Sequence, residues 1–306
     1  MTTADTVCST QPGLLVCSDF SPFSDRAVAR ACALAADLGV PLTALHVVAS
    51  GGADAFWQWL GGDGQWEQRL VEDARQRLHA QWNALPDSLP RPPLVEWQVR
   101  SGSLIAEVKA VVQALSPELV VLGAQGESDL PHLVLGTTAE RLLRRSRRPL
   151  LIVRQPADRA YRRVLVPVDF SPWTAITLQA VRRWAPSAHL VLLHAWSLPF
   201  DGKLAIAGVD ADTVAHYRMR LRNEADQWLH RIASDHRLPD GQWSPCLVMG
   251  DASHAILEQA RSQACDLIVM GKHGRHAAEE LLLGSVCKHV LTEAAVDVLV
   301  ANAPQP

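Results

Sequence analysis

The chain contains the segment Leu14-Leu-Val-Cys-Ser-Asp-Phe-Ser-Pro22 and, 150 residues later, the segment Val164-Leu-Val-Pro-Val-Asp-Phe-Ser-Pro172. Each starts with a short, continuous apolar run, which is typical of a strand covered by helices on both faces. Each ends in Ser-Pro, a common helix start in which serine caps the helix and proline takes its first position. Both segments therefore predict a strand that ends at an aspartate and leads straight into a helix.

The rest of the chain also repeats. Five further matches keep a spacing of 148 residues: Leu45-His46 with Leu193-His194, Gly102 with Gly250, Gly123 with Gly271, Gly126 with Gly274, and Gly136 with Gly284. A constant spacing over more than a hundred residues indicates a duplicated domain, and 306 residues suit two domains of about 150 each. We place the linker at Gln155–Arg159, which predicts domains at 1–157 and 158–306.

Strand and helix patterns alternate in both halves, which predicts an α/β fold: two doubly wound, open, parallel five-stranded sheets of order 3-2-1-4-5. The first half is expected to contain strands at 14–17, 42–48, 94–99, 119–122 and 150–153, with helices at 22–38, from about 66 to 85, at 104–115 and at 138–145. The second half is expected to contain strands at 164–168, 190–195, 243–249, 267–270 and 296–300, with helices at 173–184, 213–234, 252–263 and 286–291.

Composition narrows the class of protein. Hydrophobic residues make up 48% and charged residues 20%, which excludes a mainly disordered chain. The net charge of −3 and the isoelectric point near 6.4 argue against a dedicated nucleic-acid binder. No apolar run approaches the roughly 20 residues of a membrane span, and residues 1–12 lack a secretory signal. Six cysteines form no C-x-x-C pair, so we expect a reduced, cytoplasmic protein.

A glycine-rich loop follows the fourth predicted strand of each half. It reads Gly123-Ala-Gln-Gly126, nine residues, Gly136-Thr137 in the first half, and Gly271-Lys-His-Gly274, nine residues, Gly284-Ser285 in the second. Glycines let a backbone turn sharply and approach a ligand, and the last one starts a helix whose N–H groups attract phosphate. Plain turns and helix caps are the alternative. The pattern is neither a Walker loop nor a dinucleotide fingerprint.

Asp19 and Asp169 end the first strand of each half. In the predicted strand order, ligands bind where strands 1 and 4 end side by side, so the aspartate and the glycine loop should face one crevice. The aspartates could instead cap the following helices. Ser21 and Ser171 are better placed for capping, which would leave the carboxylates to a ligand.

Taken together, these motifs resemble the universal stress protein family in its tandem two-domain form, over residues 13 to 301. The resemblance rests on Val168-Asp-Phe-Ser171, Leu192-Leu-His194, Gly250-Asp251 and the two glycine motifs. It implies ATP as ligand, with Mg²⁺ as a possible companion, and a role in stress signalling or tolerance. The nucleotide-binding residues that it implies are Asp19, Val47, Gly123, Gly126, Gly136 and Thr137 in the first half, and Asp169, Ala195, Gly271, Gly274, Gly284 and Ser285 in the second.

The two glycine loops differ in charge. From the first to the last motif residue the formal charge is −2 in the first half, through Glu127 and Asp129, and 0 in the second, where Lys272 and Arg275 precede Glu279 and Glu280. A cation beside a phosphate is favourable. We therefore add Lys272 and Arg275 to the predicted site and prefer the second half.

Other features are assigned structural roles first. His46 and His194 are predicted to be hydrogen-bonded rather than catalytic. His273 and His276 lack a third metal ligand, so no metal site is predicted. The run from Arg144 to Arg148 is taken as a solvated helix end. Trp57, Trp59 and Trp66 would cover a domain interface or bind an apolar partner.

The leading interpretation is a cytoplasmic ATP-binding module without a catalytic residue and, at most, weak ATP hydrolysis. Two alternatives stay open: a nucleotide-free adaptor that acts by protein contacts, and a slow nucleotide hydrolase. The last strands, 150–153 and 296–300, are apolar sheet edges. They predict a pseudo-twofold pairing of the two domains within one chain, and the chain could also form a homodimer.

Overall fold

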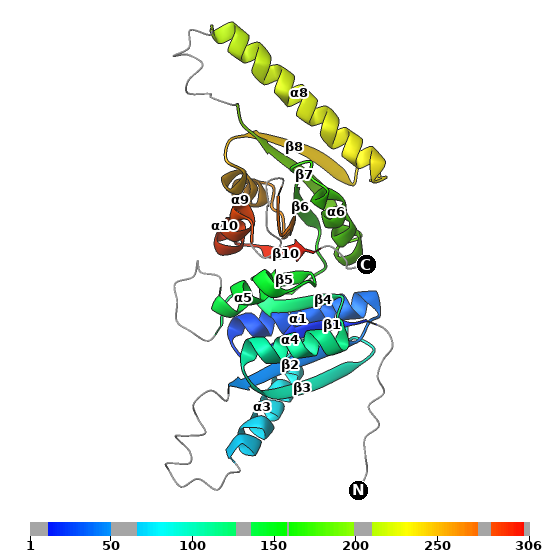
Figure 1. Cartoon of the computed structure of the whole chain (residues 1–306). Coiled ribbons are helices and arrows are strands. Elements are labelled where there is room, and N and C mark those ends of the chain that lie inside the picture. Colours follow the sequence, from blue (N-terminus) through cyan, green and yellow to red (C-terminus); the bar gives the residue numbers. More distant parts are fainter. Residues whose placement is uncertain are drawn as a thin grey trace. The chain divides into compact units, whose positions relative to one another are not determined.

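The computed structural model describes residues 12–49, 66–126, 136–157, 159–198, 210–274 and 283–302. The chain divides into two compact units, Met1–Ala160 and Tyr161–Pro306 (Figure 1). Arg30 of the first unit donates hydrogen bonds to the carbonyls of Pro156 and Arg159. These bonds hold the end of the first unit against its own helix.

The first unit alternates strands and helices as expected. Its elements are β1 (Leu14–Cys17), α1 (Pro22–Leu38), β2 (Leu42–Ala49), α3 (Trp66–Asn83), β3 (Val95–Gly102), α4 (Leu104–Leu115), β4 (Leu119–Gly123), α5 (Thr137–Arg145) and β5 (Leu150–Val153). The strand order is β3-β2-β1-β4-β5, and all four pairings are parallel. The predicted doubly wound sheet is confirmed.

The second unit repeats this plan. Its elements are β6 (Arg163–Pro167), α6 (Trp173–Trp184), β7 (His189–Trp196), α8 (Ala211–Asp235), β8 (Trp243–Met249), α9 (Ala252–Ser262), β9 (Leu267–Gly271), α10 (Ser285–Glu293) and β10 (Asp297–Ala301). Its strands lie in the order β8-β7-β6-β9-β10, again parallel throughout. Several strands extend one residue beyond the predicted end and β3 extends three, because backbone pairing continues after the apolar run stops.

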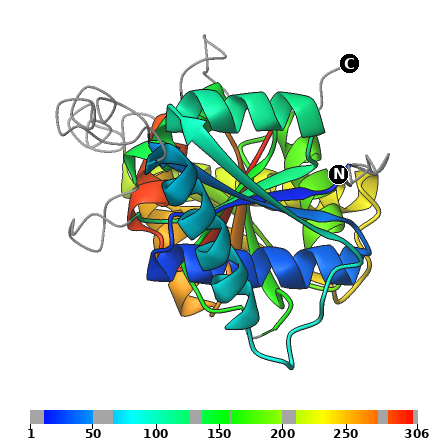
Figure 2. The same ribbon diagram turned by 90° about the horizontal axis from the view of Figure 1, so that it is seen from below.

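Helices cover both faces of each sheet, which explains the continuous apolar strands. In the first unit α1 and α4 lie on opposite sides of the strands (Figure 2). Leu15, Val16 and Val121 in the middle of this sheet are fully buried, as are Leu165 and Val269 in the second. Burial on both faces leaves no room for alternating polar residues.

The Asp-Phe-Ser-Pro turn has the same backbone in both units but different caps. Phe20 and Phe170 both adopt a left-handed conformation, with φ of 65° and 60°. Ser21 caps α1 as predicted, because its side chain accepts a hydrogen bond from the Ser24 amide. The predicted cap by Ser171 is wrong: its hydroxyl donates to Asp169 at 2.6 Å, and α6 begins after Pro172 without a side-chain cap.

A buried polar pair holds the start of the last strand in the second unit. The hydroxyl of Tyr161 donates to Asp297 Oδ2 at 2.7 Å, and Asp297 is fully buried. The bond joins the start of β10 to the segment just before β6, and Asp297 needs it because a buried carboxylate requires a hydrogen-bond donor.

Replacing Tyr161 with phenylalanine should therefore destabilise the second unit. The ring keeps its volume, but the carboxylate of Asp297 loses a donor that water cannot replace, at a cost of about 1–3 kcal/mol. Urea unfolding followed by hydrogen exchange of the β9 and β10 amides measures the effect. The exposed Tyr217 supplies the control, since Tyr217→Phe should leave the unfolding midpoint unchanged. Equal midpoints for both variants would contradict the anchoring role.

Candidate functional site

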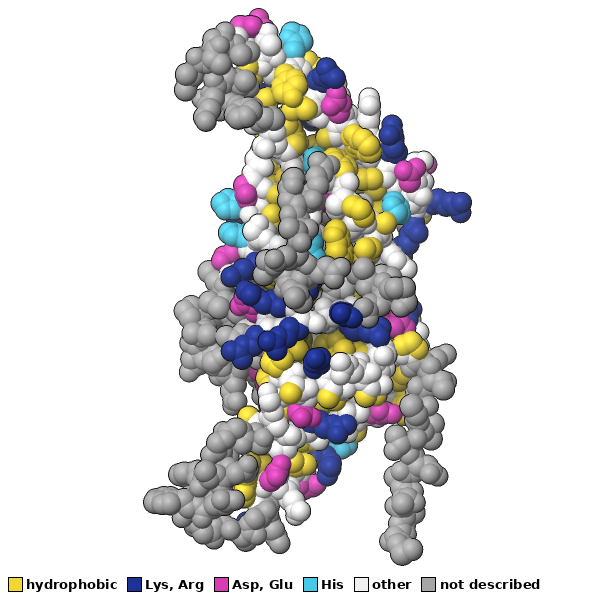
Figure 3. Space-filling model, in the orientation of Figure 1, with side chains coloured by type: hydrophobic (Ala, Val, Ile, Leu, Met, Phe, Trp, Pro, Cys, Tyr) yellow, Lys and Arg dark blue, Asp and Glu magenta, His cyan; other side chains and the backbone are white. Residues whose placement is uncertain are grey.

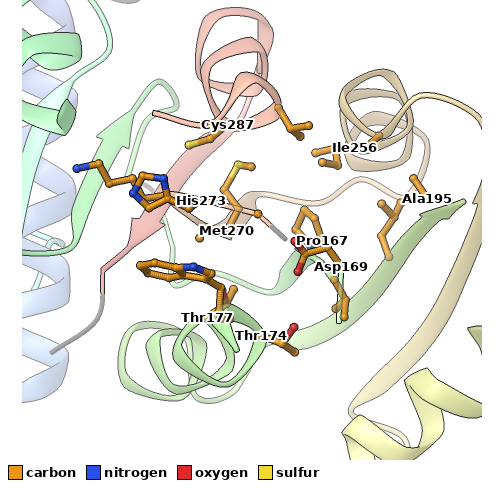
Figure 4. Close-up of a pocket in the computed structure, with 18 of the residues that line it drawn as sticks. Pro167, Asp169, Thr174, Thr177, Ala195, Ile256, Met270, His273 and Cys287 are labelled. Carbon is orange, nitrogen blue, oxygen red and sulfur yellow. The ribbon is translucent and has the colours of Figure 1, made fainter. Parts of the chain in front are cut away.

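A cavity of about 460 Å³ lies at the carboxyl ends of the strands in the second unit (Figure 4). It is built by residues at or just after the ends of β6, β7 and β9 and by the first turns of α6, α9 and α10. Its lining consists of Pro167, Val168, Asp169, Trp173, Thr174, Thr177, Leu193, His194, Ala195, Ala252, Ile256, Met270, Gly271, Lys272, His273, Gly274, Gly284, Ser285, Val286 and Cys287. The cavity lies at the edge where the strand order predicts a ligand crevice.

The aspartate after the first strand faces the glycine loop in both units. In the second, a Cβ atom on Gly274 would come within 3.0 Å of Asp169 Oδ2. In the first, a Cβ atom on Gly126 would come within 2.8 Å of Asp19 Oδ2. Each aspartate therefore lies beside the glycine loop of its own unit, as predicted. It does so because β6 and β9, like β1 and β4, are parallel and paired.

One carboxylate oxygen of each aspartate is engaged in its own turn. Oδ1 of Asp169 accepts hydrogen bonds from the amide and hydroxyl of Ser171, at 3.1 and 2.6 Å. Oδ1 of Asp19 accepts from the amide of Ser21 at 3.1 Å. The expectation that serine caps would leave the carboxylates wholly available is therefore wrong. The turn orients each aspartate so that Oδ2 faces the glycine loop.

The glycines of the loop are needed for space rather than for unusual dihedral angles. None of the six motif glycines has a positive φ, whereas Gly102 and Gly250, after β3 and β8, have φ of 148° and 143°. A Cβ on Gly123 would lie 2.8 Å from the backbone of Phe23 in α1. The first glycine permits close helix packing and the second admits the carboxylate, and the backbone bends directly after each strand, at 124–125 and 272–273, as predicted.

The third glycine starts the last helix of each unit. Gly284 is the N-cap of α10 and Gly136 the N-cap of α5, and neither cap has a side-chain hydrogen bond. Their amides donate to Lys272 O and Ala124 O, both at 3.1 Å, which ties the helix start to the first part of the loop. The first turn of α10 thus directs N–H donors and the positive end of its dipole toward the cavity, an arrangement suited to an anion.

The repeated histidines join the first two strands. His194 Nδ1 lies 2.7 Å from the Val168 carbonyl, and His46 Nδ1 lies 2.8 Å from the Ser18 carbonyl. Each carbonyl accepts a hydrogen bond, so the histidine supplies the N–H. The rings pack on Phe170 and Phe20, at 4.3 Å between centroids. This geometry matches the predicted structural role and places Ala195, next to His194, in the cavity wall.

Lys272 is a basic residue among those that line the cavity, and it is only 5% exposed. In the first unit, 148 residues earlier, the same loop position is Ala124. The comparison of loop charges also used Glu127, Asp129, Arg275, Glu279 and Glu280, all of which lie outside the described residues.

Several other predictions fall on such residues. Trp57, Trp59 and His276 lie outside the described parts of the chain, as does the side chain of Thr137. His273 is described: it lines the cavity and packs against Trp173 at 5.5 Å between ring centroids. In the described part of the Arg-rich helix end, Arg144 forms an exposed ion pair with Glu140 at 2.8 Å, consistent with a solvated surface.

Much of the cavity wall was not predicted. Trp173, Thr174, Thr177, Ile256, Met270 and Cys287 all line it, and Figure 4 shows Met270 and Cys287 on one side and Thr174 on another. The apolar members of this set are of types common in any hydrophobic core, and the two threonines belong to no motif. Position along the chain could have indicated two of these residues, because Trp173 begins the helix after the aspartate and Met270 precedes the glycine loop.

The sequence model of the Universal stress protein family matches residues 13–154 and 160–302. The chain belongs to the Universal stress protein family. The two matches cover most of both units, which confirms the tandem two-domain interpretation.

Several known proteins are similar to this chain. Universal stress protein Rv2005c of Mycobacterium tuberculosis is 29% identical over 307 residues, covering 95% of this chain and 97% of its own length. A crystal structure of a universal stress protein from Archaeoglobus fulgidus covers 95% of this chain and 98% of its own, with 18% identity and a TM-score of 0.58. A universal stress protein solved in complex with cAMP is 25% identical, covers 47% of this chain and 98% of its own, and has a TM-score of 0.31.

Among the described residues, no helix is both long enough and apolar enough to cross a membrane.

Cys287 is a buried thiol in the wall of the cavity. Burial raises the pKa of the Cys287 thiol from its ordinary 9.0 to about 12, and the positive charge of Lys272 opposes this only in part. The thiol should therefore stay protonated and unreactive near neutral pH.

We expect iodoacetamide at pH 8 to leave Cys287 unmodified in the folded protein and to modify it fully in urea, as measured by peptide mass spectrometry. Because the folded-state pKa is raised, the stability that this thiol contributes is present below pH 9 and declines as the pH rises toward 12. Labelling at native pH 8 as fast as in urea would contradict the burial.

Proposed function

We propose that this protein binds ATP or a related adenine nucleotide in the cavity of the second unit and acts as a stress-response signalling or tolerance module. The observation that carries the proposal is the meeting of Asp169 Oδ2, Gly274 and the uncapped start of α10 around one cavity of about 460 Å³. A carboxylate suits ribose hydroxyls, and an open helix start suits phosphates.

We assign the parts of a nucleotide to different residues of the cavity wall. Ile256, Met270 and Val286 supply an apolar surface for a base. Asp169 and the backbone at Ala195 lie beside it and are assigned to the adenosine. Gly271, Gly274, Gly284 and Ser285 surround the place assigned to the phosphates. The proposed site is completed by the cations Lys272 and Arg275, of which Arg275 lies outside the described residues.

The first unit is proposed as a weaker site. Asp19, Val47, Gly123, Gly126, Gly136 and Thr137 repeat the scaffold, and Asp19 faces Gly126 as Asp169 faces Gly274. The first unit has no counterpart of the buried Lys272, because Ala124 occupies that position. A phosphate would therefore gain less electrostatic stabilisation there.

Binding rather than rapid turnover is proposed. Asp169 is the one carboxylate among the described residues that line the cavity, and its Oδ1 is already held by Ser171. Fast phosphoryl transfer requires a positioned nucleophile together with several groups that neutralise developing charge. A slow hydrolase is the alternative, and single-turnover product analysis with ATP would detect it.

Gly284→Val should abolish most ATP binding by the second unit. Gly284 has φ of −58° and ψ of 146°, which valine accepts, so the variant should fold. Its Cβ would lie 3.3 Å from the Lys272 carbonyl, and its methyl groups would fill the approach to the helix start. We expect at least about a tenfold rise in Kd by calorimetry.

Gly136→Val is the matched control, because its Cβ would meet Ala124 O at an ordinary 3.6 Å. Total ATP binding should change little, provided that circular dichroism shows both variants folded. Loss of binding in Gly136→Val with retention in Gly284→Val would place the main site in the first unit and overturn the assignment.

Lys272→Met should separate phosphate recognition from adenosine recognition. Methionine keeps much of the apolar volume but removes the charge, so affinity for ATP should fall several-fold while affinity for adenosine stays within about twofold. Calorimetry with both ligands gives the ratio. Equal losses would show that Lys272 is structural.

Nucleotide released from the purified protein by acid, identified by mass spectrometry, provides an independent test. If wild-type protein releases no nucleotide and shows no heat of ATP binding, the nucleotide-free adaptor is favoured instead.

A further inference from the structure

Two histidines from different helices pack together on the surface of the second unit. His254 lies in the first turn of α9 and His289 in the middle of α10. Both are exposed, and their ring centroids are 5.5 Å apart with the planes inclined at 40°. Figure 3 shows histidine side chains side by side where Figure 1 places α9 and α10. The proposed nucleotide site uses neither residue.

The spacing of the two rings suits a shared metal ion. A ligating imidazole nitrogen lies about 2.1 Å from the metal and about 1.1 Å from its own ring centroid, so rings that share one ion at 90–110° have centroids roughly 4.5–5.2 Å apart. The observed 5.5 Å differs by a few tenths of an ångström. Exposed rings can make that adjustment by rotating about their side-chain bonds.

The surroundings also favour a cation. Asp251 caps α9, and its pKa is lowered chiefly by the hydrogen bond from Ser253, then by that from the His254 amide, with a smaller effect of the charge on His254. Glu258 and Glu293 follow the two histidines by four residues on the same helices, and both are exposed. Residues four apart lie on one helix face. Lys288, next to His289 in the sequence, is positively charged and acts against a cation.

We propose that His254 and His289 form a binding site for a divalent first-row transition metal ion that prefers nitrogen ligands, such as Ni²⁺, Cu²⁺ or Zn²⁺. No three His, Cys, Asp or Glu side chains converge on one point anywhere in the described parts of the chain. Two imidazoles therefore hold the ion, and water fills its remaining positions. Such a site is exchangeable rather than structural.

The duplication restricts this site to the second unit. At the matching positions, 148 residues earlier, the first unit has Ala106 and Arg141, which cannot chelate a metal. The ion would join α9 to α10. Both helices also line the cavity, through Ala252 and Ile256 on α9 and Ser285 and Cys287 on α10. The metal site is proposed whether or not that cavity binds nucleotide.

Calorimetry with Ni²⁺ tests the proposal. The full chain should be prepared without a polyhistidine tag and titrated at pH 8 in the absence of nucleotide, because phosphates chelate metals. We expect one Ni²⁺ per chain. His254→Ala and His289→Ala should each weaken binding at least about tenfold, since each leaves a single imidazole, and the double variant, which has neither imidazole, should bind at least as weakly as either single one. Binding should also weaken at pH 5.5, where protons compete for the nitrogens.

His216→Ala and His230→Ala are the matched controls. Both histidines are exposed on α8, and each bonds through Nδ1 to a carbonyl of its own helix. These variants should bind Ni²⁺ as the wild type does. The proposal is overturned if His254→Ala and His289→Ala retain wild-type affinity, if the controls lose as much affinity as they do, or if the wild type binds no Ni²⁺ at millimolar concentration. All four substitutions are at exposed positions, so circular dichroism should show the native fold.

Discussion

The carboxylate of Asp169 lies so close to the backbone of Gly274 that a side chain at that position would come within 3.0 Å of Oδ2. This approach depends on two parallel strands, β6 and β9, that pair directly and end at the same edge. Ser171 holds the other carboxylate oxygen, and Gly284 ties the start of α10 to Lys272. The aspartate, the loop and the helix start are thereby brought around one cavity, and the proposed function depends on this arrangement.

The two units show how a duplicated scaffold can carry different chemistry. Both retain the aspartate, the left-handed phenylalanine and the histidine that bonds across the first two strands. The two units differ in the side chains that surround these shared residues. Arg77 lies over Phe20 at 4.1 Å, whereas Trp228 packs beside Phe170 at 5.7 Å. Lys272 replaces Ala124 in the loop, and Trp173 takes the place of Phe23. Backbone geometry is thus conserved between the units while charge and ring chemistry are not.

The helices α9 and α10 connect the two sites proposed in the second unit. Their inner faces line the cavity, and their outer faces present His254 and His289. Inside the cavity wall, Cys287 is held protonated by burial. A ligand on either side of this helix pair would act on the same packing contacts. The first unit, with Ala106 and Arg141 in place of the histidines, lacks the outer half of this arrangement.

Local sequence was sufficient for the order of elements, the strand order and the pairing of Asp169 with the glycine loop. Apolar runs and helix starts are properties of neighbouring residues, and the repeat spacing of 148 to 150 residues can be counted along the chain. The right-handedness of the connections limits the possible strand orders. Tertiary structure alone revealed the cavity wall of Trp173, Met270 and Cys287, the bond from Ser171 to Asp169, the buried pair of Tyr161 and Asp297, and the contact of His254 with His289. The bond from Ser171 is local, since it lies within one turn. Each of the others joins side chains whose meeting depends on how the helices and strands pack, and no short-range pattern encodes that packing.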